Sequence, residues 1–134
     1  MLFRSYAAKD PSLTAERLFE TLFGRDILRS RFLNQMERYP ILLCPVYAVP
    51  AFRHGERSWT VDGQTVEYLD ASSYSHWFNL LGNPAAVVPI GRSDEGLPIG
   101  VQIVGRPWEE ERVLAVAAAL ERAAGWTARP DSGI

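Results

Sequence analysis

Apolar residues recur every three or four positions over residues 10–39, which is typical of amphipathic helices. The pattern predicts a first helix that begins at Asp10-Pro11, where the carboxylate accepts free backbone N–H groups and proline fits the first turn. Gly24 offers this helix a left-handed stop. A second helix is expected to start at Asp26 and to end before Tyr39-Pro40, because the residue before a proline is disfavoured in helical geometry.

Residues 41–44 form a short and uniformly apolar run. Such a run is expected of a strand that is covered on both faces in a mostly parallel sheet. Pro45 ends the run. Ligands of open α/β sheets bind just beyond the carboxyl ends of the strands, so residues 45–52 are a candidate wall of a binding pocket.

The middle of the chain carries two local signals. Residues 59–68 predict a β-hairpin, because Asp62-Gly63 supplies the two positive-φ residues of a type I′ turn between β-branched strands. We expect this hairpin to be a surface feature. Aromatic and apolar residues at helical spacing then predict a helix over residues 73–81, which Gly82 ends.

Two strands and a helix complete the pattern. Residues 85–90 and 99–104 are close enough in sequence to pair antiparallel through a turn at residues 93–96. Pro89 has no N–H to donate, so we expect it at a bulge, at a sheet edge or with its nitrogen facing away from a neighbouring strand. The last helix starts near Glu109, where acidic residues favour a helix N-terminus, and Gly125 caps it. The order of elements predicts the α/β class.

Four motifs lie between residues 79 and 107. They are Asn79-Leu-Leu-Gly-Asn-Pro84, Val88-Pro89, Gly96-Leu-Pro-Ile-Gly100 and Val101-Gln-Ile-Val-Gly-Arg-Pro107. These motifs resemble the C-terminal core of the amidase signature family, serine amidohydrolases that split carboxamide C–N bonds through an acyl-serine intermediate. The resemblance implies an α/β/α layered fold with a mixed β-sheet flanked by helices. Residues 1–134 would form a single partial domain, the C-terminal segment of an amidase domain.

The resemblance also implies which chemistry to look for. Members of the family use a serine nucleophile, a bridging cis-serine and a lysine. Ser72, Ser73 and Ser75 form the densest serine cluster, but they lack flanking glycines and are typical of a helix N-cap region. Lys9 is the only lysine among 14 basic residues and lies near the terminus. We therefore assign no catalytic residue to this chain and predict that it is inactive alone.

The role that remains is to supply the sheet core and a wall of the substrate cleft. We predict substrate contacts at Pro45, Val46, Tyr47, Trp77 and Phe78. Plain packing is the alternative role of each of them. Cys44 is expected to pack as a small hydrophobe, His54 to be solvated, and His76 to be a partly buried hydrogen-bonding residue.

The resemblance implies two partners, which are the N-terminal catalytic portion of an amidase and a small amide substrate. Other interpretations stay open. The chain is alternatively a non-catalytic binding or assembly module, a piece of a transamidosome-type amidotransferase subunit, or a truncated gene product without activity. Association into a homo-oligomer also stays open.

Composition narrows the function classes further. With 47% hydrophobic and 22% charged residues the chain has the make-up of one globular domain. A net charge of −2 gives no broad attraction to phosphate backbones, so we predict no nucleic-acid partner. The single cysteine excludes an internal disulfide and favours a cytoplasmic location. We find no apolar run long enough to span a membrane, no ligand spacing of a metal site and no phosphate-binding loop, so we predict no metal and no cofactor.

Overall fold

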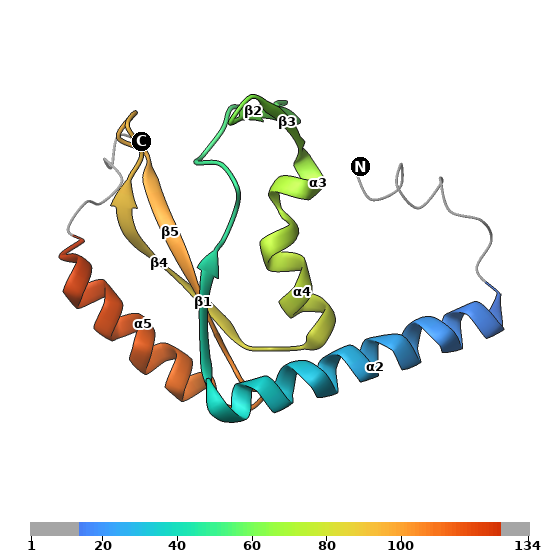
Figure 1. Cartoon of the computed structure of the whole chain (residues 1–134). Helices are drawn as coiled ribbons and strands as arrows, with labels where there is room; N and C mark the ends of the chain where they lie inside the picture. The colour runs from blue at the N-terminus through green and yellow to red at the C-terminus, as the bar shows by residue number, and fades with distance from the viewer. Residues whose placement is uncertain (1–13, 127–134) are drawn as a thin grey trace.

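The computed structural model describes residues 14–126 (Figure 1). Its helices and strands follow one another in the order α2 (Ala15–Arg38), β1 (Ile41–Pro45), β2 (Ser58–Val61), β3 (Gln64–Glu67), α3 (Tyr68–Ala71), α4 (Ser73–Leu81), β4 (Ala85–Arg92), β5 (Pro98–Gly105) and α5 (Glu110–Ala124). Strands β1, β5 and β4 form one sheet, in that order, and β2 pairs with β3 in a separate hairpin. The α/β class predicted from the sequence is confirmed.

Helix α2 is one continuous helix of 24 residues, so the prediction of two helices broken at Gly24 is wrong. Gly24 does not adopt a positive φ. A single glycine costs a helix only about 1 kcal/mol, which is too little to break it where the apolar period continues on both sides. The helix starts at Thr14, whose Oγ1 accepts from the N–H of Arg17 at 3.2 Å, and its predicted end at Tyr39 is confirmed. The predicted start at Asp10 lies outside the described residues.

The sheet is antiparallel in both of its ladders. Strand β5 pairs with β1 on one side and with β4 on the other. The expectation that residues 41–44 form a parallel strand covered on both faces is therefore wrong for this chain, since β1 lies at an edge and Leu43 is 49% exposed. A run of four apolar residues does not reveal which strand it pairs with.

Helices cover both faces of this sheet (Figure 1). On one face Val88 and Ile103 pack against Val113 and Ala117 of α5, and these four residues form a buried hydrophobic cluster. On the other face the buried Gln102 donates to the backbone carbonyl of Tyr74 in α4 at 3.4 Å. This three-layer order matches the expected α/β/α arrangement.

Apart from the stop at Gly24, the predicted turn at Asp62-Gly63 and the helix stops at Gly82 and Gly125 are confirmed. Asp62 and Gly63 have φ of 49° and 76°, as a type I′ turn requires. Gly82 ends α4 and Gly125 ends α5, both in left-handed geometry. The register of β4 shifts between Pro89 and Gly91, so a bulge, one of the placements expected for Pro89, is present.

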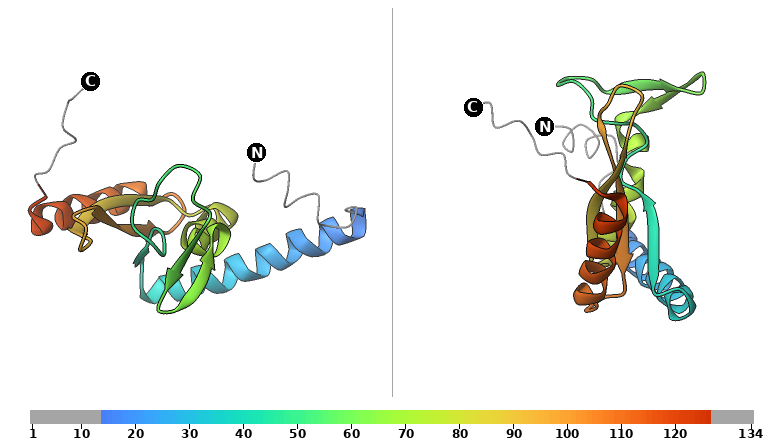
Figure 2. Two further views of the ribbon diagram at one scale, coloured as in Figure 1. Left: turned by 90° about the horizontal axis from the view of Figure 1, so that it is seen from above. Right: turned by 90° about the vertical axis from the view of Figure 1, so that its left-hand side faces the viewer.

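Hydrogen bonds join the end of α4 to α2, and the segment after α4 to β5. Arg29 donates from Nε to the carbonyl of Leu81 at 2.9 Å, and Asn83 donates to the carbonyl of Gly105 at 2.8 Å. The N-terminal half of α2 extends beyond the rest of the molecule (Figure 2). Phe19 and Phe23 in that half are 74% and 70% exposed. Apolar surface of this kind is a common place for another protein segment to bind.

Candidate functional site

A cavity of about 400 Å³ lies at the carboxyl end of β1, where the sequence predicted a pocket wall. One wall is the loop from Val46 to Phe52, and the facing wall comes from β4 and β5. Residues of the facing wall are Val87, Pro98, Ile99 and Gly100. A Cβ atom at Gly100 would lie 3.0 Å from Cγ1 of Val87 and 3.6 Å from Cγ2 of Val46. Glycine at this position therefore keeps the two walls close without filling the space between them. We call this space the inner pocket.

An aromatic cluster holds the loop in place. It consists of Tyr47, Phe52, Trp59 and Tyr68. The ring centroids of Phe52 and Trp59 are 4.6 Å apart, and those of Tyr47 and Phe52 are 5.5 Å apart. Because Trp59 belongs to β2, the hairpin packs directly on the pocket loop. The expectation that the hairpin is only a surface feature is therefore wrong.

Tyr47 links the inner pocket to the start of α3. Its hydroxyl donates to the backbone carbonyl of Tyr68 at 3.1 Å. Burial, the nearby Tyr68 phenol and its hydrogen bond raise the pKa of Tyr47 above the ordinary value of 10.0, although a hydrogen bond to Ser72 and the charge of Arg57 act in the opposite direction. Tyr47 is therefore a neutral hydrogen-bonding side chain at neutral pH.

The serines near α4 make local hydrogen bonds. Ser72 is 5% exposed, and its Oγ donates to the carbonyl of Leu69 at 3.1 Å. The same Oγ lies 3.2 Å from Nε2 of His76, whose side chain is more exposed than the sequence predicted. Ser75 donates to the carbonyl of Ser72 at 3.0 Å. Ser72 occupies the predicted cap position of α4, but its side chain caps no N–H group.

A second and larger cavity of about 770 Å³ adjoins the inner pocket through the shared residues Val49, Pro50, Ala51 and Phe52. We call it the outer pocket. Its other walls are Arg53, Glu56, Trp59, Thr60, Glu95 and Leu97. Glu56 is held firmly, since its Oε2 accepts from the backbone N–H of Arg53 at 3.0 Å and from Nε1 of Trp59 at 3.3 Å. The outer pocket therefore combines aromatic faces with charged groups.

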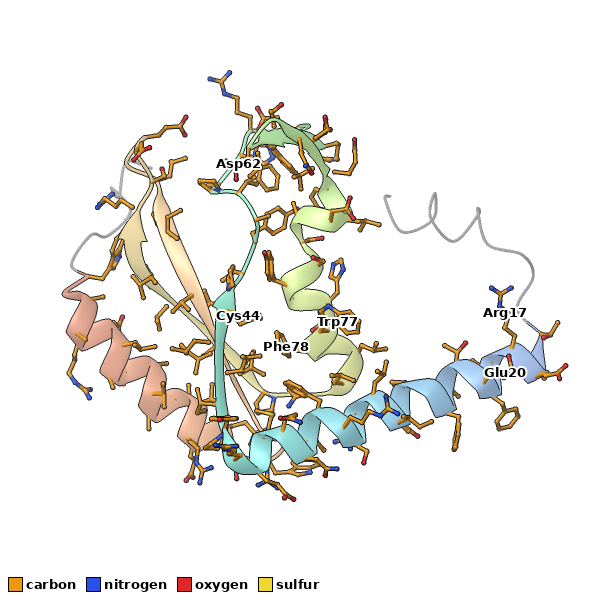
Figure 3. All side chains as sticks on the ribbon, in the orientation of Figure 1. Arg17, Glu20, Cys44, Asp62, Trp77 and Phe78 are labelled. Atoms are coloured by element: carbon orange, nitrogen blue, oxygen red, sulfur yellow. The ribbon has the colours of Figure 1, made fainter. Side chains whose placement is uncertain are left out.

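The predicted substrate contacts fall in two places. Val46 and Tyr47 line the inner pocket, and Pro45 is the last residue of β1 just before it. Trp77 and Phe78 instead line a separate apolar cavity of about 320 Å³. Its other walls are Leu28, Phe32, Leu42 and Leu81. Figure 3 shows Trp77 and Phe78 on α4, away from the hairpin that carries Asp62. The structure does not bring the five residues into one site, and their contact with substrate stays a prediction.

Sequence reasoning missed the facing wall and the outer pocket. Gly100 could have indicated the facing wall, because a glycine inside a strand often marks the close approach of another segment. The positions of Trp59 and Glu56 could not be predicted, since nothing in their local sequence reveals that the hairpin packs on the loop.

Between residues 14 and 126, no three His, Cys, Asp or Glu side chains lie close enough together to hold a metal ion. None of the helices described there combines the length and the hydropathy that crossing a bilayer requires.

Comparison with known proteins gives the family. The family model described as Amidase matches residues 5–114. The chain belongs to the amidase family. Among curated relatives, a glutamyl-tRNA(Gln) amidotransferase subunit of Granulibacter bethesdensis is 41% identical over 106 residues, a match that covers 79% of this chain and 20% of that protein. The fatty acid amide hydrolase of Arabidopsis thaliana is 36% identical over 136 residues, a match that covers 96% of this chain and 20% of that protein.

Solved structures agree with this family and with the fold. A crystal structure of an amidase superposes with a TM-score of 0.75 at 27% identity, covering 83% of this chain and 26% of that one. A 6-aminohexanoate cyclic dimer hydrolase gives a TM-score of 0.74 at 28% identity, covering 90% of this chain and 27% of that one. The present chain spans about a fifth of the length of the curated relatives that it matches.

Proposed function

We propose that this chain supplies the sheet core and one wall of the substrate cleft of an amidase. A partner portion that carries the catalytic serines and lysine completes the cleft. The observation that carries the proposal is the inner pocket, which opens at the carboxyl end of β1 between the loop 46–52 and Gly100. Its volume of about 400 Å³ lies within the range of roughly 300–1,000 Å³ that small-molecule sites have.

The proposed reaction is hydrolysis of a carboxamide. A serine Oγ of the partner portion attacks the carbonyl carbon, the C–N bond breaks, and the amine leaves with a proton. Water then cleaves the acyl-serine ester and regenerates the serine. Residues of this chain touch the substrate without exchanging protons with it. The apolar wall at Val46 and Ile99 would orient the substrate and exclude water, which speeds the chemistry by fixing the reacting atoms in place.

A second candidate function is supported by the relatives named as subunits of glutamyl-tRNA(Gln) amidotransferases. The chain would then be one part of such a subunit, which works in a larger complex. The same inner pocket would serve there, so the two candidates differ in the protein that completes it. The single cysteine supports a cytoplasmic location for either one.

The experiment is a chimeric enzyme. The matching fifth of the Arabidopsis thaliana relative is replaced by this chain, and hydrolysis of a fatty acid amide is compared with that of a form lacking this fifth. We expect the chimera to hydrolyse the amide and the shortened form to be inactive. A folded chimera with an intact thermal unfolding transition and no hydrolysis would contradict the proposal.

A matched pair of glycine variants tests the role of the inner pocket in the chimera. In Gly100→Ala the new methyl group lies in the pocket against Val87, whereas at Gly91 a Cβ meets no atom within 4 Å. We expect Gly100→Ala to lower kcat/KM by about tenfold and Gly91→Ala to leave it nearly unchanged. Equal effects of the two substitutions would show that the pocket is not used.

A further inference from the structure

The outer pocket has the size and position of a subsite. Its volume of about 770 Å³ lies within the range of roughly 300–1,000 Å³ that holds small organic ligands. It shares the loop residues 49–52 with the inner pocket, so a molecule held in the inner pocket can extend into it. The residues of its walls determine which chemical group it favours.

Two aromatic side chains form one side of the outer pocket. Phe52 and Trp59 both line it, with ring centroids 4.6 Å apart and planes tilted by 55°. The face of an indole ring attracts a cation more strongly than that of any other aromatic side chain. These rings favour a ligand with an apolar body and a positive charge.

The charged residues of the outer pocket favour the same kind of ligand. The pocket is lined by two carboxylates, Glu56 and Glu95, and by one guanidinium, that of Arg53. Arg57 belongs elsewhere, since its guanidinium lies over the ring of Tyr68 at 5.4 Å and donates to the backbone carbonyl of Glu56. Negative groups therefore outnumber positive ones along the wall.

Glu56 is held in one orientation before any ligand binds. Two donors, the backbone N–H of Arg53 and the indole N–H of Trp59, fix its Oε2 atom. A carboxylate that is already held in one orientation loses little conformational entropy when a ligand binds. Its contact with Trp59 also ties the charged group to the aromatic wall.

We propose that the outer pocket binds an ammonium group carried on a flat apolar body, as in an arylalkylamine. The inference rests on the proposed function in one respect, because the group would be the distal part of the amide substrate or of its amine product. Glu56 and Glu95 determine this specificity, and Phe52 and Trp59 hold the apolar body. Arg53 opposes the cation and limits the affinity.

The experiment measures binding to the full chain with three probes of similar shape, which are benzylammonium, benzyl alcohol and benzoate. The readout is the indole N–H signal of Trp59 in a ¹⁵N-correlated spectrum, assigned among the four tryptophans by Trp59→Phe. We expect a saturable shift of this signal with benzylammonium and about tenfold weaker binding of benzyl alcohol. Benzoate should bind more weakly still. No catalysis is needed, so the result is separate from the outcome of the chimera.

Charge variants test whether each charged residue of the outer pocket strengthens or weakens binding of benzylammonium. Glu95→Gln and Glu56→Gln should each weaken benzylammonium binding by about tenfold and leave benzyl alcohol unchanged, whereas Arg53→Gln should strengthen it. Glu37→Gln on α2 is the matched control and should change nothing. Glu95→Gln keeps the test valid if Glu56→Gln disturbs the packing of Trp59.

Three results would overturn the proposal. The first is equal binding of benzylammonium and benzyl alcohol, and the second is preferred binding of benzoate. The third is a shift of the Trp77 signal in place of that of Trp59, which would mean that the probe enters the apolar cavity of α4. A chain that passes this test while the chimera stays inactive has the subsite but not the proposed function.

Discussion

Gly105 at the end of β5 lies directly against Val113 of α5, so closely that a Cβ atom at Gly105 would overlap Cγ2 of Val113. The same glycine accepts a hydrogen bond from Asn83 and donates its N–H to the carbonyl of Pro84 at 3.0 Å. The helix, the sheet and the segment after α4 thus meet at one residue without a side chain.

Gly105→Ala should therefore destabilise the fold. The added methyl group meets the buried Val113, which is 2% exposed and cannot move into solvent. Overpacking of this kind costs about 1–3 kcal/mol. Chemical denaturation measures the loss, and Gly91→Ala, where a Cβ meets no atom within 4 Å, is the control. Equal stability of the two variants would contradict the close approach.

Gly24→Ala tests the continuity of α2. Gly24 lies inside a helix of 24 residues with ordinary helical φ and open space around it. Alanine should stabilise the chain by about 0.5–1 kcal/mol, because glycine loses more backbone entropy on folding. A drop in melting temperature would instead favour a left-handed break at this position.

Tyr47 should make stability fall at alkaline pH. Its pKa in the folded chain is raised above 10.0, so the folded state holds its proton more tightly than the unfolded state does. The resulting stabilisation is fully present below pH 10 and is lost as pH rises through the raised pKa. Unfolding of the natural chain and of Tyr47→Phe between pH 8 and pH 12 checks this. Parallel pH profiles for the two proteins would be evidence against a raised pKa of Tyr47.

The exposed apolar face of α2 should drive self-association of the chain. Phe19 and Phe23 are 74% and 70% exposed on one helix. We expect sedimentation coefficients that rise with concentration, and Phe19→Glu with Phe23→Glu should suppress the rise. Leu114→Glu on α5, a residue that is 62% exposed, is the control and should leave association unchanged. A chain that stays monomeric at every concentration would contradict self-association through Phe19 and Phe23.

Local signals predicted most of the fold. The Asp62-Gly63 turn and the left-handed stop at Gly82 are decided within a few residues, so the sequence was sufficient. The predicted helix break at Gly24 was wrong, because a glycine can also lie inside a helix. The antiparallel pairing of β1 was also mispredicted. Its partner β5 is more than fifty residues away, and the sequence of residues 41–44 does not indicate which strand they pair with.

The site was predictable only in part. The loop after β1 was predicted from a rule about the strand ends of parallel sheets, and its residues Val46 and Tyr47 line the inner pocket although this sheet is antiparallel. Trp77 and Phe78 face a different cavity, because the orientation of α4 on the sheet is fixed by tertiary contacts such as that between Gln102 and Tyr74. The aromatic cluster depends on how the hairpin packs, which no local pattern encodes.

The most direct test of the central claim is the amidase activity of the isolated chain. In this account the chain provides a cleft wall and not the nucleophile, since Ser72 and Ser75 donate to backbone carbonyls and the only lysine is Lys9. We predict hydrolysis of p-nitroacetanilide at the buffer rate and no labelling by a fluorophosphonate. Turnover that the fluorophosphonate abolishes, with the label on Ser72 beside His76 or on Ser73 or Ser75, would contradict it.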